Sequence, residues 1–232
     1  MIEEPPLLTI ARTIVRPAAG VVAQFRDTPT SFICDAMGGL GALDYRIKPV
    51  GTVRPAVGVA VTSDSRPADN LGLSAAIGLC EPGDVLVAAT GGYTGCAVAG
   101  DLMLGIARNR GVAAFVTDGL VRDLNDIETV GLPCYAVGVC PNSPQRNGPG
   151  TAGLPVLCGG VMVASGDIVV CDRDGVVVVP QGRIGAVLIA LGKVREAEAE
   201  LLAKVRGGLS EVSLINALLA GDRVRWVDDA DG

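Results

Sequence analysis

Short apolar runs, each ended by a glycine, a proline or a charged residue, constrain the fold of this chain more than any other feature of its sequence. Four runs rich in β-branched residues are typical of buried strands: residues 57–62, 85–90, 112–117 and 134–137. Helical patterns lie between them, at residues 71–79, 101–109 and 122–130. No apolar run approaches the roughly 18 residues that a bilayer-spanning helix needs, so we expect no membrane partner. The alternation predicts a layered α/β fold with helices flanking β-structure.

Both ends of the chain are predicted to be helical. Residues 8–37 have the pattern of helices interrupted near Pro17 and at residues 27–29, and residues 181–206 that of one long helix. Residues 156–179 follow a strand pattern, in which the turn at 172–175 favours a β-hairpin over a calcium loop because no ligand-rich segment follows it. Residues 141–153 are rich in glycine and proline and predict a long loop, a kind of segment that often carries function.

The sequence contains no histidine, and this absence removes many kinds of chemistry. It excludes Ser-His-Asp and Cys-His nucleophilic catalysis, histidine-ligated zinc and the usual general base. Lysine occurs only at Lys48, Lys193 and Lys204. Any catalytic or metal site must therefore use carboxylates, arginines, backbone groups and water, and oxygen ligands of this kind suit Mg²⁺ or Mn²⁺.

Charge and cysteine content limit the partners and the compartment. The net charge is −6 and the 19 lysines and arginines are spread along the chain, so no basic face is available for nucleic acid or an anionic membrane. The seven cysteines are an odd number without a C-x-x-C pair, which is typical of buried thiols in a reducing compartment. The first residues lack the pattern of a signal peptide. We therefore expect a soluble, cytoplasmic protein.

Asp101 begins a predicted helix that follows a strand and the glycine loop 91–95. Free amides at a helix N-terminus favour negative charge, so those of Leu102 and Met103 are placed to hold a carboxylate. The loop has Gly-Gly-x-x-Gly where a dinucleotide-binding turn has G-x-G-x-x-G, which argues against a dinucleotide site. Two alternatives stay open at this point: the glycines ease a tight turn, and Asp101 caps the helix.

Arg122 and Asp123 follow the next strand and its turn. Loops that follow adjacent strands of an α/β layer meet at one edge of the sheet, so we expect both residues to lie near Asp101. The three side chains would combine a carboxylate for a metal with an arginine for a planar carboxylate or enolate. The alternative is an ordinary surface pair at the start of a helix.

The segment GDLMLGIARNRGVAAFVTDGLVRDLNDIETVGLPCYAVGV, residues 100–139, resembles the core of the RraA-like family. The family signature is an aspartate, twenty residues and then Arg-Asp, which Asp101, Arg122 and Asp123 match. The segment GDIVVCDRDGVVVVP and the C-terminal helix also resemble the family, over roughly residues 30–210. The resemblance implies one RraA-like domain over residues 1–232, an αββα sandwich of the swivelling β/β/α type with its core at about 30–210. Helices at 8–37 and a C-terminal helix and tail at 181–232 would extend it.

The resemblance also implies a role for each site residue. Asp123 would be the direct ligand of Mg²⁺ or Mn²⁺, and Asp101 would hold one of the waters around it. Arg122 would contact the keto oxygen of a 2-keto acid and stabilise its enolate. Gly100 and the amides of Leu102 and Met103 would bind the substrate carboxylate.

Family resemblance further implies a site shared between subunits of a homotrimer or a dimer of trimers. Members use a glutamate from the neighbouring subunit's C-terminal helix, and spacing favours Glu198 over Glu196 and Glu200. The alternative for these three is a solvated helix face. Two departures from the family pattern, the loop 92–96 and the tail beyond Gly208, leave the shape of the pocket and the inter-subunit half of the site open.

The enzymes that this sequence resembles are 4-hydroxy-4-methyl-2-oxoglutarate/4-carboxy-4-hydroxy-2-oxoadipate aldolases. The resemblance implies a class II, metal-dependent retro-aldol cleavage that yields pyruvate, with oxaloacetate decarboxylation as a side activity. A lysine Schiff-base aldolase needs a buried lysine, which none of the three lysines provides. A methyltransferase is disfavoured because nothing resembles an S-adenosylmethionine site. The remaining alternative is a non-catalytic regulator that binds a ribonuclease, although regulators of that branch lack the intact Arg-Asp pair.

Overall fold

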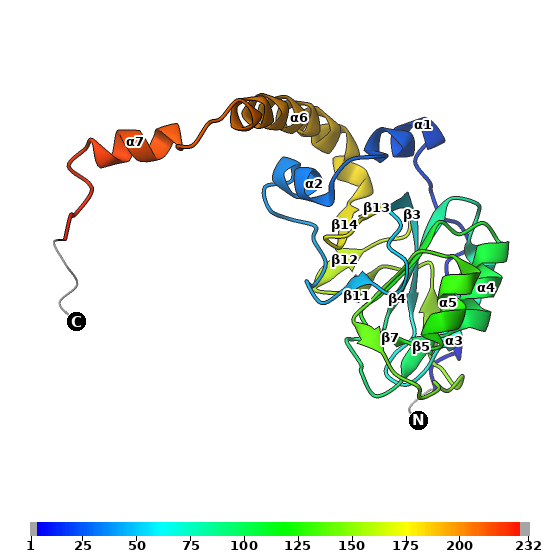
Figure 1. The fold of residues 1–232 in the computed structure, drawn as a ribbon. Helices are drawn as coiled ribbons and strands as arrows, with labels where there is room; N and C mark the ends of the chain where they lie inside the picture. Colours follow the sequence, from blue (N-terminus) through cyan, green and yellow to red (C-terminus); the bar gives the residue numbers. More distant parts are fainter. Residues whose placement is uncertain (1–3, 228–232) are drawn as a thin grey trace. The chain divides into compact units, whose positions relative to one another are not determined.

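A mixed β-sheet forms the centre of the computed structural model, which describes residues 4–227 (Figure 1). Its strands run in the order β1-β10-β3-β4-β6-β8-β2, and the hairpin β13–β14 joins it through β3. The bounds of the seven strands in that order are Leu8–Ile10, Gly150–Ala152, Ala56–Asp64, Asp84–Ala89, Ala114–Thr117, Cys134–Ala136 and Lys48–Pro49. The neighbours β3, β4, β6 and β8 are parallel, so their carboxyl ends lie at one edge of the sheet.

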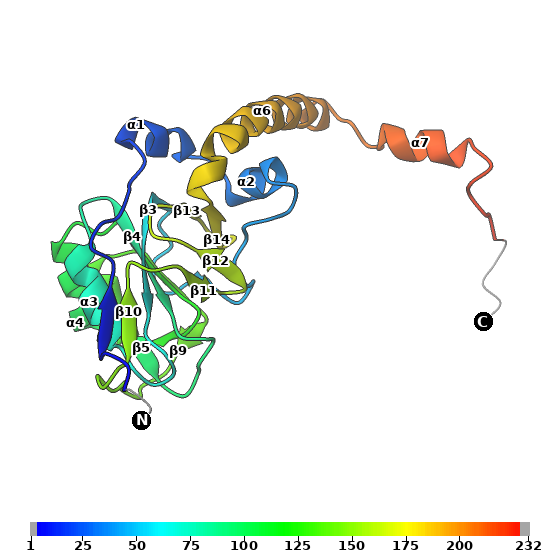
Figure 2. The same cartoon turned by 180° about the vertical axis from the view of Figure 1, so that it is seen from behind.

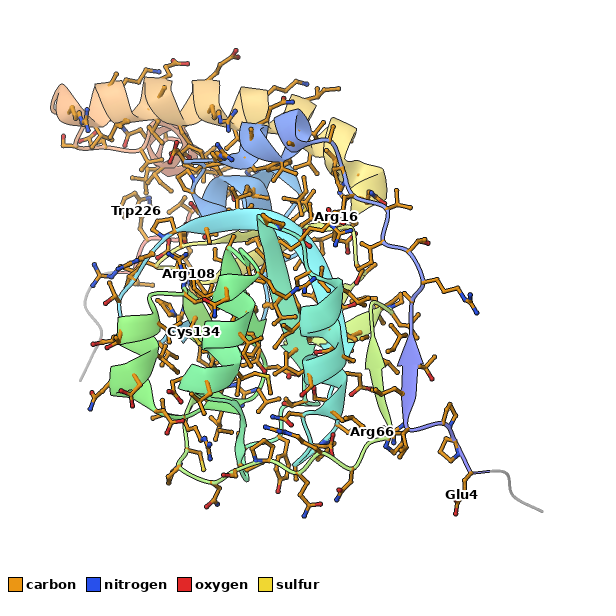
Figure 3. The ribbon with its side chains drawn as sticks, turned by 90° about the vertical axis from the view of Figure 1, so that its right-hand side faces the viewer. Glu4, Arg16, Arg66, Arg108, Cys134 and Trp226 are labelled. Carbon is orange, nitrogen blue, oxygen red and sulfur yellow. The ribbon has the colours of Figure 1, made fainter. Side chains whose placement is uncertain are left out.

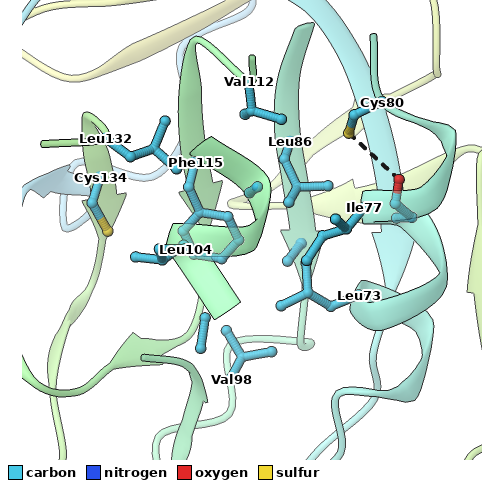
Figure 4. Packing of buried hydrophobic residues seen from close by; sticks show 14 of the residues in the cluster. Leu73, Ile77, Cys80, Leu86, Val98, Leu104, Val112, Phe115, Leu132 and Cys134 are labelled. Carbon is cyan, nitrogen blue, oxygen red and sulfur yellow. Dashed lines mark hydrogen bonds between the residues drawn. The ribbon is translucent and has the colours of Figure 1, made fainter. Parts of the chain in front are cut away.

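Three helices cover one face of this sheet, as Figures 1 and 2 both show. They are α3 (Leu71–Leu79), α4 (Asp101–Asn109) and α5 (Leu124–Val130), each preceding the next parallel strand. Their apolar side chains pack on the strands around Leu73, Leu104 and Phe115, which are fully or almost fully buried (Figure 4). Burial at this interface holds the helices against the strands and so holds the first turn of each helix in place.

The opposite face of the sheet is covered by further β-structure. It comprises β11 (Val156–Cys158), β12 (Val161–Val163), β13 (Ile168–Cys171) and β14 (Val176–Val179). Side chains alternate along a strand, so Val169 and Val178 of the hairpin face the main sheet. Val170 and Val177 face the other way, toward α2 (Thr30–Ala36) and the first part of α6 (Ile184–Arg206). The layers therefore follow the order α, β, β, α, and the predicted αββα sandwich is confirmed.

A small parallel sheet positions the loops at the carboxyl edge. Its strands β5 (Ala97–Ala99), β7 (Leu120–Val121) and β9 (Gly138–Val139) are paired in that order. Each comes a few residues after one of the strands β4, β6 and β8. The chain thus leaves the main sheet, forms a second set of parallel pairs and only then enters α4 or α5.

The N-terminal region differs from the prediction of helices over residues 8–37. Leu8–Ile10 is strand β1, residues 11–18 are irregular, and helix starts only at α1 (Ala19–Val22), followed by a 3₁₀ turn (Ala23–Phe25). Strand β1 pairs with β10, which lies inside the predicted loop 141–153, as the ribbon shows (Figure 2). Each strand supplies the backbone partners of the other, and a pairing between segments so distant in sequence leaves no local pattern.

The C-terminal helix agrees with its prediction, since a 3₁₀ turn at Gln181–Arg183 leads into α6. The chain divides into two compact units, Met1–Leu191 and Gly192–Gly232. The second unit holds the end of α6 and the short helix α7 (Ser213–Leu219). Among residues 4–227, no helix is long and apolar enough to cross a membrane.

A buried ion pair fastens the irregular segment 11–18 to the sheet. The Arg16 guanidinium donates to the Asp84 carboxylate with Nη2 2.8 Å from Oδ2, and these side chains are 20% and 3% exposed. Arg16 (Figure 3) also donates to the carbonyl of Leu79 at 3.0 Å. Removing one partner of a buried pair leaves the other charge without compensation. We expect Arg16→Gln to lower the free energy of unfolding by about 3 kcal/mol, measured by urea denaturation.

Arg46→Gln is the matched control for this prediction. Arg46 lowers the pKa of Asp44 to about 2 through its side-chain hydrogen bond, but the two side chains are 58% and 28% exposed. Solvent screens such a pair, so the variant should unfold at nearly the wild-type urea concentration. Equal midpoints for the two variants would contradict the role given to Arg16.

Candidate active site

The pairing of β5 with β7 brings the sequence-predicted residues together. Ala97 is in register with Leu120 and Ala99 with Val121, and the amide of Arg122 donates to the carbonyl of Ala99 at 3.0 Å. Gly100 and Arg122 are the residues that follow these strand ends. Gly100 and Arg122, which are separated by 21 residues in the sequence, therefore become direct neighbours.

Gly100 lies against the Arg122-Asp123 pair so closely that it leaves no space for a side chain. A Cβ atom at this position would lie 2.4 Å from Asp123 Oδ2 and 3.0 Å from Arg122 Cγ. The backbone of Gly100 is extended, at φ −136°, so glycine is needed here for space and not for conformational freedom. Its predicted place in the site is consistent with this geometry.

Asp123 has a backbone conformation that is unusual for a residue with a side chain. It is left-handed, with φ 63° and ψ 48°, and precedes α5, which begins two residues later than predicted. Its carbonyl accepts the amide of Ile127 at 2.9 Å, yet its carboxylate makes no capping hydrogen bond. Strained residues cluster at functional sites. The conformation turns the carboxylate toward Gly100 and away from the helix end, where a cap would lie.

Arg122 and Asp123 form an ion pair that remains open to solvent. Nε of Arg122 lies 3.1 Å from Oδ2 of Asp123, and the side chains are 34% and 36% exposed. The Nη1 group of Arg122 donates to the hydroxyl of Ser143. A guanidinium held from two sides presents its remaining N–H groups in a fixed orientation, which suits recognition of a planar oxygen pair.

Helix α4 begins at Asp101, with Gly100 as the residue that precedes it and no side chain capping it. The first amides of a helix have no partner within the helix, so those of Leu102 and Met103 remain available to a ligand. The Asp101 side chain makes no hydrogen bond or ion pair with another described residue. Asp101 is therefore not the helix cap, which was the alternative to a site role.

These groups line a pocket of about 280 Å³. It includes the predicted residues Gly100, Asp101, Leu102, Met103 and Arg122, together with four that sequence reasoning missed: Asn70, Ser143, Pro144 and Arg146. Ser143 and Arg146 belong to the breaker-rich segment 141–153, whose length had marked it as a functional loop. Nothing in the sequence indicated that Asn70 belongs to the site. It lies in the turn between a predicted strand and a predicted helix, where asparagine is common.

The glycine loop 91–95 lies at a different pocket. Gly91 and Gly92 line another pocket, and the amide of Gly92 donates to the buried carboxylate of Asp118 at 3.1 Å. Asp118 also accepts the amide of Thr90 at 2.7 Å. The loop therefore has a structural anchor of its own and does not line the pocket of Arg122. The role of residues 92–96 in shaping the substrate pocket stays a prediction.

Glu198 lies on α6 in the second unit and is half-buried, whereas Glu196 and Glu200 are exposed. Glu200 forms an ion pair with Lys204, with Oε1 2.6 Å from Nζ. The role of Glu198 in a neighbouring subunit's site stays a prediction.

The oxygen donors at the pocket fit a small hard cation. Within residues 4–227, no three acidic or cysteine side chains come together as a metal cage. Mg²⁺ keeps several waters and is commonly held by one or two carboxylates plus the substrate. Asp101, which lines the pocket, and Asp123, which is paired with the pocket residue Arg122, offer two such carboxylates without histidine or thiolate.

Comparison with known proteins identifies the family. The family model described as RraA-like, Aldolase/RraA, matches residues 30–178, which is more than half of the chain. A relative from Halalkalibacterium halodurans, named "Putative 4-hydroxy-4-methyl-2-oxoglutarate aldolase", is 36% identical over 85% of this chain and 93% of its own length. The chain belongs to the RraA-like family, as its sequence resemblance predicted.

Solved structures agree with this assignment. An uncharacterized protein from Pseudomonas syringae pv. tomato superposes with a TM-score of 0.75 at 25% identity, covering 90% of this chain and 97% of that one. Streptomyces coelicolor RraAS2, described as an unusual member of the RNase ES inhibitor RraA protein family, gives 0.71 at 26% identity, over 82% of this chain and 100% of that one. The family thus contains proteins named as aldolases and proteins named as ribonuclease inhibitors.

The contact at Gly100 generates a test. Gly100→Ala places a methyl group 2.4 Å from Oδ2 of Asp123, which is too close for either to stay, so the carboxylate must move while the fold persists. We expect affinity for Mn²⁺, measured by calorimetry, to fall about 10- to 100-fold, the loss typical of a disturbed ligand neighbour.

Gly105→Ala is the control for the same substitution. Gly105 lies inside α4, and an added Cβ meets its nearest neighbour, Val130 Cγ2, only at 4.0 Å. This variant should stabilise the protein by up to about 1 kcal/mol and leave Mn²⁺ affinity unchanged. Equal metal affinity in both variants would show that the Gly100 contact does not hold Asp123 in place.

Proposed function

We propose that this protein is a divalent-metal-dependent lyase that cleaves a 4-hydroxy-2-keto acid and releases pyruvate, with oxaloacetate decarboxylation as a side activity. The observation that carries the proposal is the convergence of the Arg122-Asp123 pair with the open N-terminus of α4 around Gly100. This arrangement offers a cationic group, a carboxylate and free amides to one small anionic molecule. The names of the aldolase relatives support the same reaction.

The substrate carboxylate binds at the amides of Leu102 and Met103, where the helix dipole favours negative charge. Arg122 then faces the C2 keto oxygen. When the C3–C4 bond breaks, its electrons move toward that oxygen, and Arg122 stabilises the charge that develops there. The C4 hydroxyl becomes a carbonyl, and a proton added at C3 completes pyruvate. Oxaloacetate loses CO₂ through the same C3–C4 cleavage.

Asp123 holds the metal, and Mg²⁺ or Mn²⁺ supplies Lewis-acid stabilisation of the same developing charge when bound. Asp101 has no side-chain partner among the described residues and lines the same pocket as Arg122. Its carboxylate orders a water, and this water accepts the proton of the C4 hydroxyl. The scheme uses only carboxylates, a guanidinium group, backbone amides and water. It therefore needs no histidine, which this sequence lacks.

The self-association that we propose, a homotrimer or a dimer of trimers, rests on the surface of α4. Leu102 and Ile106 are 77% and 54% exposed beside the pocket. They are four residues apart and so share one face of the helix. A neighbouring subunit that covers this face would exclude water from the pocket and bring Glu198 to the metal, whose donor set within one chain is small.

A single assay tests the catalytic proposal. Purified protein with Mg²⁺ or Mn²⁺ should release pyruvate from oxaloacetate, and EDTA should abolish the release. Asp123→Asn keeps a residue that tolerates the left-handed conformation but removes the charge. We expect it to reduce kcat/KM by about 100-fold or more, as loss of a charge-stabilising group does.

Arg108→Gln is the control, because Arg108 lies exposed on α4 outside the pocket. It should retain the wild-type rate. If metal has no effect on any keto acid and the protein instead binds a ribonuclease, the regulator described for RraA proteins would replace the aldolase proposal.

A further inference from the structure

A second cavity lies away from Arg122, and the proposed function does not use it. Its volume is about 560 Å³, against about 280 Å³ for the pocket of Arg122, and the two share no lining residue. It is bounded by the start of β3 and the end of β13, where Ala56 is in register with Cys171. Because the site of Arg122 follows the carboxyl ends of the parallel strands, this cavity lies at the opposite edge of the sheet (Figure 1). Its volume falls within the range of small-ligand sites.

Apolar side chains form most of the wall of the second cavity. They come from three segments of the chain, and the larger ones are Phe25, Pro29, Pro55, Val57 and Val170. The carboxylate of Asp172 also lines the cavity but is already engaged, because Oδ2 accepts the amide of Thr30 and Oδ1 accepts its hydroxyl, each at 2.8 Å. The charged groups that remain for a ligand are those of Arg26 and Asp27.

Arg26 and Asp27 are the two central residues of a tight turn beside this cavity. The amide of Thr28 donates to the carbonyl of Phe25 at 3.3 Å. Arg26 has φ −60° and ψ 145°, and Asp27 has φ 56°, which together define a type II turn. Glycine or asparagine is the usual residue at the position of Asp27, because a positive φ is required there. The turn by itself therefore does not account for an aspartate.

Neither charge of the turn is compensated within the protein. In the part of the chain that the structure describes, the side chains of Arg26 and Asp27 form no hydrogen bond or ion pair, with each other or with another residue. Both are exposed in the free protein and both line the same apolar cavity. A ligand that carries only one charge would pair with one of them and leave the other without a partner.

We propose that the second cavity binds a zwitterionic α-amino acid with a large apolar side chain. The Arg26 guanidinium binds the ligand carboxylate through two parallel N–H groups, and the Asp27 carboxylate accepts from the ligand ammonium group. The apolar side chain of the ligand packs against Phe25, Val57 and Val170. This binding site goes beyond the proposed lyase function, since it contains none of the residues assigned to catalysis.

Calorimetric titration of the full-length protein with L-phenylalanine tests the proposal. Three analogues each remove one feature: N-acetyl-L-phenylalanine lacks the ammonium group, L-phenylalaninamide lacks the carboxylate, and L-alanine lacks the large side chain. We expect L-phenylalanine to bind, and each analogue to bind about 10-fold more weakly or worse, because each leaves a charged group or the apolar wall without its partner.

Variants of the turn test which residues hold the ligand. Arg26→Gln and Asp27→Asn should each lower the affinity for L-phenylalanine about 10- to 100-fold, and asparagine tolerates the left-handed conformation of Asp27. Arg173→Gln is the matched control, because Arg173 is exposed near the same strand end but does not line the cavity. It should bind as the wild type does.

Asp27→Gly separates loss of charge from loss of fold. Glycine adopts a positive φ without strain, so the urea midpoint should stay the same or rise while the affinity falls. Asp123→Asn, which alters the lyase site alone, should retain binding. Absence of binding to L-phenylalanine, equal binding of its N-acetyl or amide form, or undiminished binding in Arg26→Gln and Asp27→Asn would each overturn the assignment.

Discussion

The parallel pairing of β5 with β7 is the interaction on which the candidate site depends. It is a short pairing, in register at Ala97 with Leu120 and at Ala99 with Val121, and the amide of Arg122 extends it to the carbonyl of Ala99. Because the ladder ends at the same level on both strands, Gly100 meets Arg122 and Asp123 directly. A shift of one residue would turn every side chain of one strand to the opposite face and separate these groups.

The site that results combines rigid backbone with incompletely compensated charge. Asp123 is held in a left-handed conformation, and Arg146 is held by the loop that Asp69 fastens. Fixed groups of this kind need little reorganisation when charge develops on a ligand, which is the main source of electrostatic stabilisation in enzymes. The partly exposed carboxylates and the two arginines suit a small, polar, multiply charged molecule better than an apolar one.

The core explains why such short elements hold these positions. The main sheet is buried on both faces, by α3, α4 and α5 on one side and by the β13–β14 hairpin on the other. The hairpin is itself buried on both faces, and for this reason residues 176–179 are all valine. With aromatics at 3%, the packing relies on many small branched side chains.

The sequence by itself determined the alternation of strands and helices in the middle of the chain, the histidine-free chemistry and the spacing of Asp101, Arg122 and Asp123. These are local properties, because periodicity, composition and spacing can be read from the sequence without knowing any tertiary contact. Only the tertiary structure decided that residues 8–10 form a strand, since β10 supplies its partners from residues 150–152. It likewise decided that Asn70 and Arg146 join the site, because hydrogen bonds between segments some 76 positions apart bring them together. Long-range pairing has no local signature, and for that reason the half of the pocket around Asp101 and Arg122 was predictable and the half around Arg146 was not.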